Sequence, residues 1–545
     1  MNTLQAAVAQ RARTHPDSIA LAHDLGHVSY AALHRLAMQA AAGLHARGVR
    51  AGDVIAVQLP NSMPFVVTLL AAGALGATVQ MLHMPYRRAE LSTLLVHGGA
   101  SAYVGLCRFK DTAPLATVDA LGTARLLIGV QAGTADAEEG LSAGAVAWPA
   151  LLRSGEGGAP PAVAPASAAT RYVLLHTSGT TADPKGVPVS HAQFIGNAAA
   201  ALEPLQIRAS DVLLPAAPFT HLYGLFVLEM GLLAGACVSL LPAFTPAALP
   251  VVVRRDRVTA IFAGPAHFRP LLDQPGATAA TAVGTGAGAF DGVRLVCLSG
   301  TAVARELAQA VESLLPRGQV IQLWGMSELQ AGSYGRPDDP ADLRLGTAGR
   351  PSPGTELRIR SDGADLPAGS EGRLQVRGPS LFSGYLDNPQ ATAAAFTDGW
   401  FDTGDTGYLT PEGALVLTGR TKEIINRGGV KFNPLDVEAI IDRIPGVARS
   451  AIVPMPDPVL GERACVFVQP AAAQPQGAPE LTLAAVTRML EHAGIARFKW
   501  PERLELVDEM PLTPTQKIMR GRLVARLAQA GSQDGTIATS TRSVE

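Results

Sequence analysis

The run from Thr177 to Gly186, Thr-Ser-Gly-Thr-Thr-Ala-Asp-Pro-Lys-Gly, contains the residue types that bind phosphate. It follows the apolar stretch Tyr172–His176, which predicts a buried strand. Hydroxyl side chains and backbone N–H groups around a glycine can converge on phosphate oxygens, and Lys185 adds positive charge. A Walker A loop would instead need Gly-Lys-Ser/Thr at the start of a helix. The run therefore predicts a nucleoside triphosphate site unlike that of a P-loop ATPase.

These ten residues resemble the phosphate loop of the adenylate-forming family, which includes acyl-CoA synthetases, luciferases and peptide-synthetase adenylation domains. The family's loop reads Thr-Ser-Gly-Thr-Thr-Gly-x-Pro-Lys-Gly, so Ala182 departs from it. The alternative, a turn between two strands without a ligand, is disfavoured by the length of the match. The resemblance assigns the following residues to ATP or AMP: Thr177, Ser178, Gly179, Thr180, Thr181 and Lys185.

Two further motifs resemble the family's adenine and α-phosphate segments, and they follow in the family's order. Ser299-Gly300-Thr301-Ala302 is similar to the glycine turn beneath the adenine. Trp324-Gly325-Met326-Ser327-Glu328 matches Tyr-Gly-x-Thr-Glu. The resemblance implies that Trp324 stacks on adenine, that Ser327 binds the α-phosphate and that Glu328 binds Mg²⁺. The nucleotide site would therefore also contain Gly300, Thr301, Ala302, Gly325 and Met326.

The ribose and hinge motifs come next along the chain. Asp405, in a Thr-Gly-Asp turn, corresponds to the aspartate that accepts the ribose hydroxyls. Arg420 resembles the arginine that binds ribose and phosphate, and Lys422 lies where the family has its interdomain hinge. Gly428 and Gly429 belong to a segment that resembles the lining of the family's pantetheine tunnel, where glycine lets the backbone approach coenzyme A closely.

A lysine near the C-terminus completes the set of motifs. Residues 511–518, Pro-Leu-Thr-Pro-Thr-Gln-Lys-Ile, resemble the family's terminal Pro-x-Thr-x-x-Gly-Lys-Ile. The resemblance makes Lys517 the cation that bridges the acyl carboxylate and the α-phosphate, while Gln516 replaces the usual glycine. The predicted catalytic residues are therefore Lys517, His221, Glu328 and Arg420.

The segment Pro218–Gly224 resembles the Pro-x-x-His-x-x-Gly of acyl- and aryl-CoA synthetases, in which the histidine borders the substrate carboxylate and gates the acceptor channel. No aspartate lies between 220 and 224, so a buried substrate ammonium would lack a partner and an amino-acid substrate is disfavoured. Small and apolar positions predict a pocket for a hydrophobic acid: medium-chain fatty, alicyclic or aromatic. The predicted acyl pocket consists of His221, Tyr223, Val227, Ala331 and Gly332.

Composition limits the class of protein. The 545 residues include 44 Lys plus Arg and 46 Asp plus Glu, and the net charge of -2 provides no bulk field for nucleic acid or anionic lipid. The four cysteines lack metal-ligand spacing and are too few for a disulfide framework, as is typical of a reducing cytoplasm. Residues 1–17 lack the pattern of a signal peptide and predict a short amphipathic helix.

The elements that must position these motifs can be read from the pattern of apolar residues. Short β-like runs alternate with helical ones up to about residue 420, which predicts parallel sheets covered by helices. Apolar stretches at 65–82 and 222–253 are interrupted by glycine, proline and polar residues, so we predict α/β core there and no integral membrane segment. Residues 346–417 predict a small β-rich subdomain.

The predicted fold is therefore α/β: a large N-terminal domain of helix-covered sheets with the β-rich subdomain, and a smaller, mobile α+β C-terminal domain. We expect the N-terminal domain at 1–420, the C-terminal domain with its catalytic lysine at 421–530, and a disordered tail at 531–545. The C-terminal domain should contain helices at 434–443 and 481–493 and paired strands at 450–453 and 464–468.

The motifs together predict a cytoplasmic ATP-dependent carboxylate–CoA ligase that forms an acyl-adenylate and then an acyl-CoA thioester, with ATP, Mg²⁺ and coenzyme A. Three alternatives remain open: loading of a carrier-protein phosphopantetheine, an acyl-AMP ligase with blocked CoA access, and a non-catalytic nucleotide-binding protein. The last follows from the departures at Ala182 and Gln516.

Overall fold

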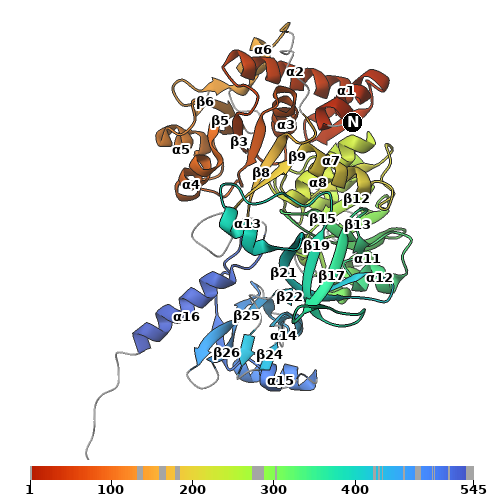
Figure 1. Cartoon of the computed structure of the whole chain (residues 1–545), viewed down its shortest axis with the longest axis vertical. Coiled ribbons are helices and arrows are strands. Elements are labelled where there is room, and N and C mark those ends of the chain that lie inside the picture. The colour runs from red at the N-terminus through yellow and green to blue at the C-terminus, as the bar shows by residue number, and fades with distance from the viewer. Residues whose placement is uncertain are drawn as a thin grey trace, which may run out of the picture. The chain divides into compact units, whose positions relative to one another are not determined.

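The computed structural model of the chain is shown in Figure 1. It describes residues 3–131, 139–158, 167–177, 185–272, 288–300, 303–420, 425–427, 430–432, 434–457, 461–472, 480–493, 495, 497–513 and 516–534. By its contacts the chain divides into two compact units. Unit 1 comprises residues 1–357, 376–401 and 410–416, and unit 2 comprises 358–375, 402–409 and 417–545. The boundary at 420 stays a prediction.

The first sheet of unit 1 has the order β7-β6-β5-β3-β4-β8-β9, with β9 antiparallel to β8 and the other pairs parallel. Its parallel strands β3 to β6 are buried along nearly their whole length, as is typical of a sheet that helices cover on both faces. Its strands are β3 (Val54–Gln58), β4 (Thr78–Met81), β5 (Ala100–Leu106), β6 (Leu126–Val130), β7 (Val146–Ala147), β8 (Arg171–Thr177) and β9 (Lys185–Ser190).

The second sheet of unit 1 has the order β16-β15-β14-β13-β12-β10-β11-β1-β2. Its interior strands are parallel, and β15, β16 and β2 are antiparallel to their neighbours. The strands are β1 (Ile19–His23), β2 (Gly26–Ser29), β10 (Val212–Pro215), β11 (Cys237–Ser239), β12 (Ala260–Ala263), β13 (Leu295–Leu298), β14 (Gln319–Met326), β15 (Gln330–Tyr334) and β16 (Arg350–Pro351).

Helices surround these sheets, and burial follows their sequence pattern. The predicted N-terminal helix is α1, which buries Leu4 and Val8 and ends near Arg11 and Arg13. The apolar stretch that begins at residue 65 lies in α3, which is buried along nearly its whole length, and continues into β4, in agreement with the predicted α/β core. The helices of unit 1 are α1 (Leu4–Thr14), α2 (Tyr30–Ala46), α3 (Met63–Leu75), α4 (Arg88–Gly98), α5 (Pro114–Leu121), α6 (Trp148–Ser154), α7 (His191–Ala201), α8 (Leu222–Ala234), α9 (Ala248–Asp256), α10 (Pro265–Leu272), α11 (Arg305–Glu312), α12 (Ala341–Gly346) and α13 (Pro389–Ala395).

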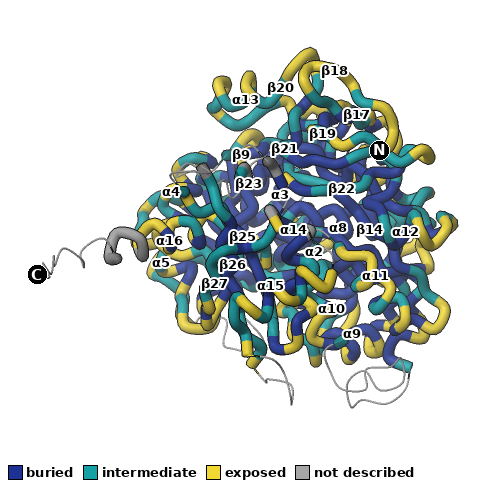
Figure 2. Tube along the Cα trace, turned by 90° about the horizontal axis from the view of Figure 1, so that it is seen from below, coloured by how far each residue is buried: buried dark blue, intermediate teal, exposed yellow. Residues whose placement is uncertain are grey.

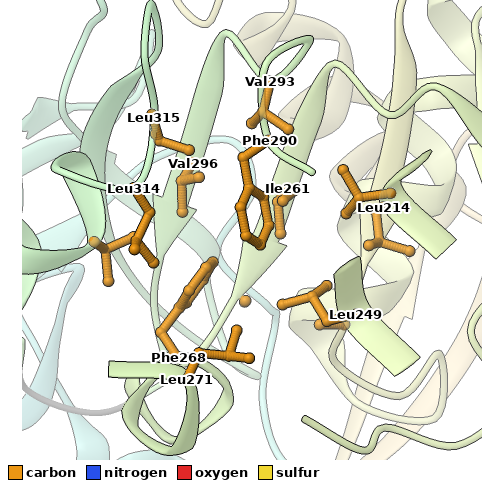
Figure 3. Packing of buried hydrophobic residues seen from close by; sticks show 14 of the residues in the cluster. Leu214, Leu249, Ile261, Phe268, Leu271, Phe290, Val293, Val296, Leu314 and Leu315 are labelled. Carbon is orange, nitrogen blue, oxygen red and sulfur yellow. The ribbon is translucent and has the colours of Figure 1, made fainter. Parts of the chain in front are cut away.

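Apolar packing accounts for the arrangement of strands and helices. Figure 2 shows the central strands largely in the dark blue of buried residues, with exposed segments on turns and outer helices. Figure 3 shows one cluster in which Phe268 of α10 and Phe290 pack against Ile261 of β12 and Val296 of β13. Burying side chains of this size stabilises the fold by about 1.5–3 kcal/mol each relative to exposure.

A buried amide joins the two sheets of unit 1 at their carboxyl ends. Asn61 follows β3 of the first sheet and is 3% exposed. Its Nδ2 donates to the carbonyl oxygens of Pro215 (3.3 Å) and Ala217 (3.0 Å), and its Oδ1 accepts from the N–H of Phe219 (2.7 Å). These hydrogen bonds fix the backbone just before His221.

A smaller sheet forms the predicted β-rich region. Its order is β18-β17-β19-β21-β20, and β22 pairs with β21. Its strands are β17 (Glu356–Ser361), β18 (Ala364–Asp365), β19 (Gly372–Arg377), β20 (Phe396–Thr397), β21 (Trp400–Leu409) and β22 (Leu415–Arg420).

The C-terminal part of unit 2 contains a sheet in the order β24-β23-β26-β25, with β27 parallel to β26. Different helices pack on its two faces. Because successive side chains in a strand point to opposite faces, Val466 of β26 packs with α14 and α15 while Phe467 packs with α16. The predicted helices and paired strands are present. The elements are β23 (Ile425–Arg427), β24 (Val430–Phe432), α14 (Pro434–Ile441), β25 (Val447–Asp457), β26 (Gly461–Pro470), α15 (Leu483–His492), the 3₁₀ turn Arg497–Lys499, β27 (Arg503–Leu506) and α16 (Arg520–Asp534).

Two further sequence predictions concern the tail and the membrane. Helix α16 continues through Asp534, so the segment expected as tail from 531 begins as helix, and residues 535–545 lie outside the described residues. Among the described residues, no helix combines the length and the apolar character that crossing a membrane requires.

A buried ion pair holds the start of α16. Arg520 Nη1 and Nη2 lie 2.5 Å and 2.7 Å from the two carboxylate oxygens of Glu438 on α14, and Nη1 also donates to the Ile452 carbonyl. The side chains are 15% and 8% exposed. Removal of one partner of such a pair leaves a buried charge without compensation.

We therefore predict that Glu438→Ala lowers the free energy of unfolding of the C-terminal sheet by about 3 kcal/mol. Glu491→Ala is the matched control because its pair with Arg497 is 61% and 82% exposed, and its loss should cost below about 0.5 kcal/mol. Hydrogen exchange of peptides from β25 and α14 in urea measures both. Equal effects of the two substitutions would contradict the assignment.

Candidate active site

The predicted phosphate loop lies at the carboxyl end of β8. Thr177, the last residue of β8, pairs with Lys185, the first residue of β9, so the ends of the loop are adjacent. Gly186 also needs its lack of a side chain, because a Cβ there would lie 2.9 Å from His97 Cε1 on α4. The pairing with Thr177 places Lys185 at the base of the loop. Residues of the predicted nucleotide and CoA sites that lie outside the described residues are Ser178, Gly179, Thr180, Thr181, Thr301, Ala302, Lys422, Gly428 and Gly429.

Glu328 lies in the turn between β14 and β15 and is 6% exposed. Its Oε1 accepts a hydrogen bond of 2.9 Å from the Tyr385 hydroxyl, and its carbonyl oxygen accepts one of 2.7 Å from the N–H of Phe382. A buried carboxylate requires such donors, because desolvation otherwise disfavours its charged form. Glu328 is therefore held in place by the segment 382–385.

The same tyrosine contacts the lysine of the phosphate loop. Lys185 Nζ lies 4.7 Å from the centre of the Tyr385 ring, within the range of a cation–π interaction. Lys185 and Glu328, which the sequence predicted for one nucleotide site, thus both contact Tyr385. Lys185 lies over its ring, and Glu328 accepts a hydrogen bond from its hydroxyl. Sequence reasoning missed Tyr385, since Gly384-Tyr385 carries no recognisable chemistry by itself.

A divalent cation fits this arrangement. Among the described residues no three His, Cys, Asp or Glu side chains gather as a metal cage. A single buried carboxylate such as Glu328 suits Mg²⁺, which is commonly bound by one or two carboxylates together with substrate phosphates and water.

Trp324 and the glycines beside it form a closely packed hairpin. Trp324 of β14 pairs with Ser333 of β15 and is 6% exposed. A Cβ on Gly332 would lie 2.4 Å from Trp324 Cζ3, and one on Gly325 would lie 2.1 Å from the Gln330 carbonyl oxygen. Gly332, a predicted acyl-pocket residue, therefore lies directly against the indole ring, and its contact with an acyl group stays a prediction.

His221 is the N-cap of α8. Its Nδ1 accepts a hydrogen bond of 3.2 Å from the N–H of Tyr223, so the proton of the neutral ring is on Nε2. Tyr223 is buried and donates to the carbonyl oxygen of Cys297 on β13 (2.8 Å). Helix α8 also buries Val227, and Ala331 of β15 is 3% exposed. The predicted acyl-pocket residues thus lie in unit 1, on α8 and β15 and at the helix start.

A second histidine, not identified from the sequence, lies beside His221. His83 follows β4, its Nδ1 is 2.9 Å from Thr220 Oγ1, and its ring centre is 6.3 Å from that of His221. Burial lowers the pKa of His83 to about 4, so the ring is neutral at physiological pH.

Unit 2 contains the predicted ribose and lysine residues. Arg420 Nε lies 2.8 Å from Asp405 Oδ1, and the two side chains are 53% and 6% exposed. Residues 512 and 518 form a β-bridge, and within this hairpin Lys517 N–H donates to Thr513 Oγ1 at 3.0 Å. Gln516 has φ +65°, a left-handed conformation that glycine adopts without strain. The substitution of the family's glycine therefore carries a backbone cost.

The buried histidines make stability depend on pH. Burial lowers the pKa of His83, His176 and His191 to about 4, about 3 and about 4, and His97 and His83 contribute further to the shift at His176. Below about pH 6.5 the unfolded chain binds protons that the folded chain excludes.

We therefore predict that the free energy of unfolding is fully retained above pH 6.5 and falls as pH drops toward 4, by up to about 1.4 kcal/mol per pH unit for each histidine. His83→Gln should reduce this slope, while His15→Gln, at an exposed position, should leave it unchanged. Urea titrations between pH 4.5 and 7.5 measure the slopes. An identical slope in His83→Gln and the unmodified protein would refute the prediction for His83.

Comparison with known proteins identifies the family of this chain. A family model described as AMP-binding enzyme matches residues 8–386, and one described as AMP-binding enzyme C-terminal domain matches residues 436–517. The chain is 31% identical over 522 residues to a feruloyl-CoA synthase from Amycolatopsis sp, which covers 95% of this chain and 97% of the relative. It is 34% identical over 522 residues to a salicylyl-CoA synthase / salicylate adenylyltransferase from Streptomyces sp, with coverage of 94% and 91%.

Among solved structures, ATP-bound MatB from Rhodopseudomonas palustris superposes with a TM-score of 0.82 at 26% identity, over 96% of this chain and 98% of that chain. The predicted fold class and the AMP-forming acid–thiol ligase class are confirmed. ATP, Mg²⁺ and coenzyme A are the predicted set, and they are the set that the CoA ligases of this family use. The chain belongs to the AMP-binding enzyme family.

Proposed function

We propose that this protein joins a hydrophobic carboxylic acid to coenzyme A through an acyl-adenylate. The observation that carries the proposal is the convergence of Lys185 and Glu328, distant in sequence, on Tyr385. A phosphate-binding cation and a buried acidic ligand for Mg²⁺ are what a site for a triphosphate requires. The names of the relatives, a feruloyl-CoA synthase and a salicylyl-CoA synthase, support an acid as substrate and a thioester as product.

In the first half-reaction a carboxylate oxygen attacks the α-phosphorus of ATP, the bond to the β-phosphate oxygen breaks, and pyrophosphate leaves. Lys185 and Lys517 supply positive charge where two anions approach. Glu328 would hold Mg²⁺, which neutralises phosphate charge. In the nucleotide site, Trp324 contacts the adenine, and Asp405 with Arg420 binds the ribose.

In the second half-reaction the thiol of coenzyme A attacks the acyl carbonyl carbon, loses its proton and displaces AMP. We propose that the C-terminal domain, taken as residues 421–530, pivots at Lys422 and brings Gly428 and Gly429 toward the pantetheine arm. His221 borders the carboxylate, and its Nδ1 accepts a hydrogen bond from the N–H of Tyr223, which leaves the proton of the neutral ring on Nε2.

The acid is proposed to be medium-chain fatty, alicyclic or aromatic. Residues 222–228 of α8 are all buried, and none of them is charged. The first acidic residue of this helix, Glu229, is fully buried, and burial raises its pKa well above the ordinary value, so it would be neutral. A substrate ammonium would find no anionic partner on this helix.

A panel of acids tests the proposal. We expect pyrophosphate release with at least one hydrophobic acid and none with amino acids, and an acyl-CoA product by mass spectrometry. An acyl group found on a holo-carrier protein but never on coenzyme A would replace the proposal with carrier loading. The absence of pyrophosphate with every acid would identify a non-catalytic nucleotide-binding protein.

We predict that Lys517→Ala lowers adenylation about 100- to 1000-fold, the effect of losing one preorganised charge-stabilising donor. Thioester formation from pre-made acyl-adenylate should be largely retained, because the second step does not need this charge. Rapid-quench assays of each half-reaction measure the difference, with the exposed Lys110→Ala as control. An equal loss in both half-reactions would remove Lys517 from the proposed role.

A further inference from the structure

Tyr385 is anchored more firmly than an ordinary surface tyrosine. Its backbone N–H donates to Thr392 Oγ1 (2.9 Å), and its ring lies edge-on to Phe382 with the centres 4.8 Å apart. The next residue, Leu386, donates its N–H to the Gly186 carbonyl oxygen (2.9 Å), which fastens this segment to β9 directly beside Lys185. The tyrosine is therefore fixed relative to both of its charged neighbours.

The two contacts of Tyr385 use different parts of the side chain. The hydroxyl donates to Glu328 Oε1 at 2.9 Å, and the face of the ring attracts Lys185 Nζ at 4.7 Å. The hydroxyl is the donor in the first contact, because a carboxylate oxygen can only accept a hydrogen bond. One substitution can remove the hydroxyl alone, and another can remove both contacts.

We propose that Tyr385 is a positioning residue for adenylation, which orients the Glu328 carboxylate through its hydroxyl and holds the Lys185 ammonium against its ring. The inference rests on the proposed function, since both charged groups act there on MgATP. The hydrogen bond fixes the direction of the carboxylate before a cation binds, and the ring restrains a flexible lysine without neutralising its charge. Tyr385 itself forms and breaks no covalent bond.

The two roles predict different dependence on Mg²⁺. Tyr385→Phe keeps the ring and removes the hydroxyl, so we expect turnover in pyrophosphate release to fall about tenfold, the scale of one hydrogen bond to a charged group. The Mg²⁺ concentration for half-maximal activity should rise several-fold. Tyr385→Leu should add a loss of ATP affinity that remains without Mg²⁺, because the contact with Lys185 is also lost.

Calorimetric titration supplies a measurement independent of turnover. With Mg²⁺ present, ATP should bind Tyr385→Phe several-fold more weakly than the unmodified protein, and with EDTA present the two should bind ATP equally. Tyr334→Phe is the matched control: Tyr334 is a buried tyrosine of β15 whose hydroxyl has no hydrogen-bond partner within the described part of the chain. This control should match the unmodified protein in every assay.

Three outcomes would overturn the inference: a Tyr385→Phe variant within twofold of the unmodified protein in turnover and Mg²⁺ dependence, a weakened ATP affinity that persists in EDTA, or an equal loss in both half-reactions together with a lowered melting temperature. The last would indicate a merely structural tyrosine. If the unmodified protein releases no pyrophosphate with any acid, the proposed function fails, and the titration still tests the tyrosine separately.

Discussion

The hydrogen bonds of Asn61 are the constraint on which the geometry of unit 1 depends. The loops that follow parallel strands lie at the carboxyl ends of one sheet, but this alone does not bring the carboxyl ends of two separate sheets together. Asn61 links them, because its buried amide forms hydrogen bonds with backbone groups of Pro215, Ala217 and Phe219. His83, which follows β4, adds a contact to Thr220. The start of α8, with His221, is thus fixed against the sheet whose strand β8 leads into the phosphate loop.

Three buried carboxylates, two of them in predicted site residues, each have a hydrogen-bond or ion-pair partner. Glu328 receives a hydrogen bond from Tyr385, Asp405 pairs with Arg420, and Glu438 pairs with Arg520. Each pairing offsets the cost of removing a charge from water. Arg520 lies two residues after the hairpin formed by residues 512–518, which contains Lys517. Its pair with Glu438 therefore anchors the chain next to this candidate catalytic residue.

Departures from the family's motifs have physical consequences that the structure makes explicit. Gln516 stands where the family's motif has glycine and adopts a left-handed conformation, at a cost of about 1–2 kcal/mol for a residue with a side chain. The hairpin nevertheless forms, because Thr513 hydrogen-bonds the backbone of Gln516 and Lys517. Gly332 shows a packing role for a small residue, because a Cβ there would lie 2.4 Å from the Trp324 ring, and its predicted place in the acyl pocket stays a prediction.

The sequence by itself determined the elements and the class of chemistry. Short β-like runs between helical ones predicted the helix-covered sheets of unit 1, and the runs at 450–453 and 464–468 predicted a pair of strands in the C-terminal sheet, because burial of a strand requires apolar residues at neighbouring positions of the sequence. The phosphate-loop motif and the Glu328 motif predicted the family, since each needs particular residue types at fixed spacing. The predicted roles of the individual residues remain proposals.

Only the tertiary structure decided which side chains meet. Tyr385 and Lys185 come from distant parts of the sequence, and so do His83 and Thr220, and neither pair has a local signature. The same is true of Arg520 and Glu438, whose spacing in the chain carries no information about their contact. Contacts of this kind depend on how sheets and helices pack, and packing is set by the summed burial of many apolar side chains rather than by any short motif.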